Sequence, residues 1–162
     1  MADSTLSFKI QDNHGRFVGP FGIMLSIPAV GVNFFELAKS LSSVPGLPVQ
    51  AREIAILTVG AHFQAKYELY AHSKLAAKAG LMEGEIEGFS QGQRPGTSDI
   101  QGRVAFDVAS ELLKSSGPLR PNLWAQAVEA FGHAGATALV QFVGFYAYTC
   151  IILNGFDAQV PT

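Results

Sequence analysis

Three residues in the sequence have side chains and spacing that suit acid–base chemistry. Glu68 and His72 are four positions apart, so on a helix both side chains point to the same side, one turn apart. Glu53 begins the preceding helix-like segment. A carboxylate beside an imidazole fixes its tautomer and raises its basicity, and the pair can exchange protons with a substrate. Because both segments are apolar, these groups would be costly in a core unless they paired with each other.

The same residues also permit simpler explanations. Glu53 can be a first-turn acid that the helix dipole favours, and Glu68 with His72 can be a surface pair on one helix. The three could also be metal ligands, since Glu68 and His72 have ligand spacing. Two carboxylates and one histidine without a further cluster of ligands are a weak metal signal, and we expect no metal.

Composition limits the class of protein. The chain has 162 residues, of which 48% are hydrophobic and 15% charged, which indicates one globular domain with a sizeable core. Eleven basic residues against thirteen acidic ones argue against a nucleic-acid partner. Cys150 is the single cysteine, so an internal disulfide and a cysteine-based zinc site are excluded. A first segment without a signal-peptide pattern agrees with a cytoplasmic protein.

The periodicity of apolar residues predicts an all-α fold of about six to eight helices, with no alternating strand pattern. Residues 1–18 are expected to be a partly extended N-terminal segment, and 19–162 a single helical domain. Pro20 and Pro28 permit only short helices near 20–28. Ser98 or Asp99 and then Asn122 are candidate N-caps. The expected helices cover about 29–41, 49–63, 66–79, 82–89, 99–113, 122–131 and 134–153.

The segment Ala134–Leu153 is twenty residues without a charge, which is long enough to cross a membrane. It contains Gln141 and two threonines, and no cluster of Lys or Arg flanks it. We therefore expect a buried central helix or a subunit-interface helix, and no membrane association.

Several motifs carry a family resemblance in their order and spacing. They are "GPF" at 19–21, "REIAIL" at 52–57, "YELYAH" at 67–72, "AAKAGLMEGEIE" at 76–87 and the apolar segment at 131–156. Over about residues 19–158 the chain resembles the carboxymuconolactone decarboxylase-like group of the AhpD-like superfamily. The resemblance implies an AhpD-like helical bundle that assembles as a homo-trimer or homo-hexamer.

The peroxidase branch of that superfamily uses a Glu, a CxxC motif and a His. Glu53 and His72 match the Glu and the His, but the two cysteine positions hold Ala65 and Glu68. Neither residue can supply the thiolate that disulfide chemistry needs. The chain therefore looks like the non-redox branch, which implies a cofactor-free decarboxylase, lyase or isomerase.

For such chemistry we assign proton transfer to His72, its orientation or the acid role to Glu68, and a second carboxyl to Glu53. We expect substrate contacts from Tyr67, Tyr70, Phe21 and Arg52 and expect most other aromatic residues in the core. Basic residues near the motif are few, so we expect a small lactone, keto-acid or phenolic, polyketide-like substrate. The alternative is a non-catalytic, oligomeric protein of the same fold that binds a small molecule.

Overall fold

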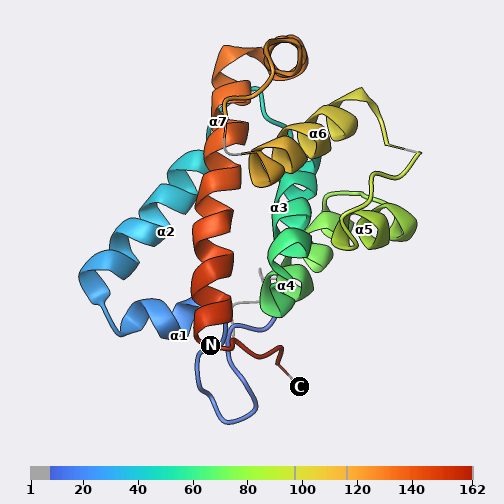
Figure 1. Cartoon of the computed structure of the whole chain (residues 1–162). Helices are drawn as coiled ribbons and strands as arrows, with labels where there is room; N and C mark the ends of the chain where they lie inside the picture. Colours follow the sequence, from blue (N-terminus) through green and yellow to red (C-terminus); the bar gives the residue numbers. More distant parts are fainter. Residues whose placement is uncertain (1–7, 97, 116, 162) are drawn as a thin grey trace.

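The computed structural model describes residues 8–96, 98–115 and 117–161, and Figure 1 shows that helices make up most of this chain. Within these ranges no β-strand is formed, and an isolated bridge pairs Gln11 with Phe17. The helices are α1 (Pro20–Leu25), α2 (Pro28–Ser42), α3 (Val49–Phe63), α4 (Lys66–Lys78), α5 (Glu83–Ser90), α6 (Ile100–Lys114) and α7 (Pro121–Gly155). The predicted all-α class and range of helix number are confirmed.

Helix α3 lies at the centre of the fold and contacts α4, α5, α6 and α7. All its residues from Glu53 to Gly60 are buried, which agrees with a helix that is apolar around its whole circumference. Its observed bounds are the predicted ones, whereas α4 ends one residue earlier than expected. Because α3 is surrounded, any polar side chain on it must find its partner inside the protein.

The prolines and caps behave partly as expected. Pro20 and Pro28 each occupy the first turn of a helix, where the missing N–H is not needed. Asp99 caps α6, because its Oδ1 accepts the backbone N–H of Gly102 at 2.6 Å. The expectation that Asn122 caps the next helix is wrong: α7 already begins at Pro121, a residue suited to the first helical position.

The long apolar helix α7 changes direction at Gly132. This residue has φ 69° and ψ 170°, a left-handed region that favours glycine. Figure 1 shows the residues before it as turns that lie across the top of the long, straight remainder. The two helices predicted for 122–131 and 134–153 are therefore the two arms of α7.

The second arm of α7 places one face in the core. Leu139, Phe142 and Cys150 are buried, whereas Tyr148 and Ile151 are exposed. By length and composition α7 could cross a membrane, but a core helix of a soluble protein passes the same test, and half of its most apolar stretch is buried inside the protein. Its packing against α3 and α6 agrees with a helix of the protein core.

The described part of the N-terminal segment forms a turn that Asp12 stabilises. Its carboxylate accepts the backbone N–H groups of His14 at 2.8 Å and Arg16 at 3.0 Å. Residues 1–7 of the expected extended segment lie outside the described residues. The division of the chain into 1–18 and 19–162 stays a prediction.

We expect Asp99→Ala to lower the free energy of unfolding by about 1 kcal/mol, because the Gly102 N–H loses its cap. Urea unfolding followed by circular dichroism measures this change. Asp99→Asn keeps an acceptor oxygen and should unfold close to the wild type. Equal stability of the alanine variant and the wild type would show that the cap contributes nothing.

Candidate active site

A tight connection between α3 and α4 sets the position of the predicted acid–base residues. Helix α3 ends at Phe63, Gln64 takes a left-handed conformation with φ 51°, and α4 begins at Lys66. A Cβ at Gly60 would lie 3.0 Å from Leu69 Cδ2, so glycine here allows the two helices to approach closely. The hairpin thereby turns α4 back against α3, whose first turns carry Glu53.

The structure brings Glu53, Glu68 and His72 together. His72 Nδ1 lies 2.7 Å from Glu53 Oε2, in a hydrogen bond, and His72 Nε2 lies 3.0 Å from Glu68 Oε1. All three residues are buried, with relative exposures of 8%, 3% and 9%. The predicted grouping therefore forms, and its members are not the exposed helix-surface pair of the simpler explanation. We refer to the three residues as the Glu–His–Glu cluster.

The two carboxylates of the cluster differ in their contact with the imidazole. The contact between Nε2 and Glu68 Oε1 is short, but its direction does not meet hydrogen-bond geometry. As a result, Glu68 Oε1 is buried without a hydrogen-bond partner among the described residues. An unpartnered buried oxygen is energetically costly. The imidazole is thus hydrogen-bonded to Glu53, whereas its contact with Glu68 is an ion pair without hydrogen-bond geometry.

Electrostatics give His72 a positive charge at neutral pH. Burial by itself would lower the pKa of His72, but the charges of Glu68 and Glu53 and their contacts with the ring outweigh it. The net effect raises this pKa from 6.5 to about 10. At neutral pH the imidazole therefore carries both ring protons and can donate one.

The arrangement differs from that of a metal site. The two ring nitrogens of His72 lie near two different carboxylates, so the three side chains do not converge on one central point. Within the described ranges, no group of three or more His, Cys, Asp or Glu side chains has the arrangement of a metal site. The geometry is that of a buried ionic cluster.

Helix α7 contributes two residues beside the cluster that sequence reasoning did not assign to it. The Tyr146 ring lies 5.1 Å from the His72 ring, in an edge-to-face arrangement at 83°. Cys150 is fully buried one turn later. Burial first, and then the charge of Glu68, raises the pKa of both side chains, so both stay protonated. Their four-residue spacing, which places both on one side of α7, was the signal that the sequence offered.

The four predicted substrate contacts have other partners in this structure. The Tyr67 hydroxyl donates to the Lys9 carbonyl at 3.3 Å, and the Tyr70 hydroxyl accepts from Lys74 Nζ at 3.2 Å. Arg52 donates to the carbonyl of Ser42, at the end of α2. The fourth, Phe21, stacks on Phe35 in a pair formed by α1 and α2. Their roles in substrate binding stay predictions.

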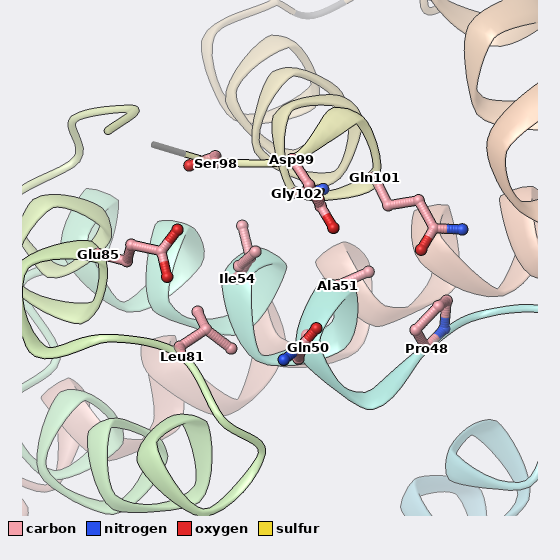
Figure 2. Close-up of a pocket in the computed structure, with 10 residues that line it drawn as sticks. All are labelled: Pro48, Gln50, Ala51, Ile54, Leu81, Glu85, Ser98, Asp99, Gln101 and Gly102. Atoms are coloured by element: carbon pink, nitrogen blue, oxygen red, sulfur yellow. Dashed lines mark hydrogen bonds between the residues drawn. The ribbon is translucent and has the colours of Figure 1, made fainter. Parts of the chain in front are cut away.

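A cavity of about 190 Å³ lies near the start of α6, and Figure 2 shows the residues that line it. It is lined by Pro48, Gln50, Ala51, Ile54, Leu81, Glu85, Ser98, Asp99, Gln101 and Gly102. Two of its carboxylates cap helices: Asp99 accepts from Gly102, and Glu85 accepts the Met82 N–H at 3.1 Å. Because no member of the cluster lines this cavity, we do not identify it as the active site.

No protein-family model and no curated protein sequence matches the chain. Among solved structures, the chain is similar to the debrominase Bmp8, seen as a cysteine-to-alanine variant in complex with 2,3,4-tribromopyrrole. The TM-score is 0.76 and the sequence identity 14%, over 91% of this chain and 79% of that one. At this identity the likeness shows the fold alone, and the predicted AhpD-like helical bundle is confirmed at that level.

We expect the His72→Gln variant to differ most from the wild type in stability at low pH. Folding raises the pKa of His72 from 6.5 to about 10, so the folded protein binds this proton more tightly than the unfolded chain does. The stability that this adds is at its full value below pH 6.5 and is lost as pH rises through about 10. The difference in unfolding free energy between the two proteins should therefore shrink across this interval. Urea unfolding at a series of pH values measures it, with exposed His62→Gln as the matched variant. A difference that grows with pH would contradict the assigned charge.

Proposed function

We propose that this protein is a cofactor-free acid–base enzyme of the carboxymuconolactone decarboxylase-like type. It acts as a decarboxylase, lyase or isomerase on a small lactone, keto-acid or phenolic compound. The observation that carries the proposal is the charged imidazole of His72, which is buried between Glu53 and Glu68. Burying three ionisable groups costs folding free energy, and perturbed groups of this kind cluster at functional sites.

A buried proton donor suits reactions in which a carbon atom must be protonated. In the decarboxylation of a phenolic or enolic acid, a proton adds to the carbon that bears the carboxylate. The carbon–carbon bond then breaks, its electron pair returns to the ring or enol, and carbon dioxide leaves. His72 gives up one proton per turnover and regains one from solvent. Glu68, with its unpartnered Oε1, is placed to carry that proton.

The structural neighbour supports part of this proposal. The Bmp8 complex contains a small aromatic ring, 2,3,4-tribromopyrrole, and that protein is an enzyme. An aromatic substrate for this chain agrees with that ligand and with the aromatic residues near His72. Debromination is a different reaction from the decarboxylation proposed here, so the choice of reaction rests on the Glu–His–Glu cluster and the sequence motifs.

We also propose that the protein is a cytoplasmic homo-oligomer, with the trimer and the hexamer as the expected forms. Only a narrow stripe of α2 is buried, at Gly31, Phe34 and Leu41. The rest of α2, together with the end of α1 and the residues that join the two helices, exposes large apolar side chains. These are Leu25, Ile27, Val30, Val32, Phe35 and Leu37. Figure 1 shows α2 standing beside α7 at the edge of the fold. An apolar surface of this kind indicates a protein contact.

Carbon dioxide release and deuterium uptake from heavy water test the reaction, over a panel of lactone acids, β-keto acids and phenolic acids. We expect turnover by the wild type and a loss of about 10²-fold or more in His72→Gln, because the proton donor is removed. His62→Gln, which replaces an exposed histidine at the end of α3, should keep full activity. Both variants should show the circular dichroism of the wild type.

The results separate the enzyme from its alternative. Activity that persists in His72→Gln would contradict the acid role of the cluster. A compound that binds without turnover, in a folded wild-type protein, would support the non-catalytic binding protein instead.

Light scattering tests the assembly. The chain has a mass of 17.2 kDa, and we expect the measured mass of the wild-type assembly to be about three or six times that value. Leu37→Glu should reduce the measured mass of the assembly, because it places a charge in the exposed apolar surface of α2 that we expect to form the subunit contact. Ser40→Glu, also on the exposed side of α2 but at a polar position, is the matched control. A wild type that elutes as a monomer would refute the oligomer.

A further inference from the structure

Tyr146 is fixed beside the Glu–His–Glu cluster by aromatic contacts. Its ring stacks on Phe142 at 6.0 Å and 6°, meets Phe145 edge to face at 5.3 Å, and meets His72 edge to face at 5.1 Å. Two of these partners are buried residues of α7 itself. Rings held on several sides lose little further freedom when a ligand binds, so the phenol is already oriented.

The Tyr146 hydroxyl has no hydrogen-bond partner within the described part of the chain. The residue is half-buried rather than enclosed. Tyr67 and Tyr70 differ in this respect, because the Lys9 carbonyl and the Lys74 ammonium engage their hydroxyls. Buried tyrosine hydroxyls usually find a partner. Of the three tyrosines considered for this site, Tyr146 is thus the one whose hydroxyl makes no hydrogen bond within the described part of the chain.

The charges around Tyr146 keep its hydroxyl protonated. Burial is the largest cause that raises its pKa, followed by the carboxylates of Glu68 and Glu53, and Arg52 acts weakly in the other direction. A neutral phenol donates one hydrogen bond and cannot attract a cation as a phenolate would. Its natural ligand partner is therefore an oxygen with lone pairs, such as a carbonyl or a phenol oxygen.

We propose that the Tyr146 hydroxyl donates a hydrogen bond to an oxygen of the substrate while His72 supplies the proton to carbon. This inference rests on the proposed function and adds to it the residue that orients the substrate. The two donors lie on α7 and α4, so a substrate bound to both contacts two helices at once. Because Phe142 and Phe145 flank the Tyr146 ring, we expect the ligand to carry an acceptor oxygen next to an apolar or aromatic group.

The substitution Tyr146→Phe removes only the hydroxyl and tests the role directly. With a substrate found in the panel above, we expect kcat/KM to fall by about 10²-fold, as for the loss of one donor to a developing negative charge. A substrate analogue without the acceptor oxygen should react equally slowly with both proteins. Tyr148→Phe is the matched control, because it removes an exposed hydroxyl two residues further along α7.

A binding measurement separates this inference from the proposed reaction. The probe is 4-nitrophenol, titrated into each protein and followed by its absorbance. We expect Tyr146→Phe to weaken binding by about tenfold and Tyr148→Phe to leave it unchanged. If no compound is turned over while binding still depends on Tyr146, the reaction fails and the donor role stands.

Three results would overturn the donor role. The first is equal kcat/KM in Tyr146→Phe and the wild type, and the second is equal binding of 4-nitrophenol by the two. The third is a wild-type protein that binds no 4-nitrophenol at millimolar concentration.

Discussion

The rest of the structure depends on the pairing of one imidazole with two buried carboxylates. Three ionisable groups inside apolar helices are stable only if each compensates another. The 2.7 Å hydrogen bond from His72 to Glu53 joins α4 to α3, and the 3.0 Å contact to Glu68 holds the ring against its own helix. The close approach at Gly60 and the turn at Gln64 are the backbone conditions that make this pairing possible.

The two carboxylates of the cluster differ in their hydrogen bonds. Glu53 completes a well-formed hydrogen bond, whereas Glu68 Oε1 has none among the described residues. Helix α7 covers the imidazole with the ring of Tyr146, and its hydroxyl is a second polar group without a partner in the described part of the chain. A buried carboxylate oxygen without a hydrogen bond, such as Glu68 Oε1, is unfavourable for stability alone. A ligand that supplies the missing partners is the physical basis of the proposed site.

Local signals predicted much of the fold and part of the site. The bounds of Val49–Phe63, the cap at Asp99 and the pairing of Glu68 with His72 follow from periodicity and spacing, which act over a few residues. The contact of Glu53 with His72 spans nineteen positions and came from the family resemblance rather than from spacing. Tyr146 was missed because α7 approaches α4 only through tertiary packing. Spacing had favoured Tyr67 and Tyr70. Tertiary packing engages the Tyr67 hydroxyl with the Lys9 carbonyl, and Lys74 of the same helix engages the Tyr70 hydroxyl.

Nitrogen-15 NMR of the imidazole measures the charge of His72 directly. With histidine labelled in the ring, the wild type and His72→Gln identify the His72 resonances. We expect two protonated ring nitrogens at pH 7.5, with loss of a proton only as pH approaches about 10. A His72 signal that shows one unprotonated nitrogen at pH 7.5, and titrates near or below 6.5, would contradict it.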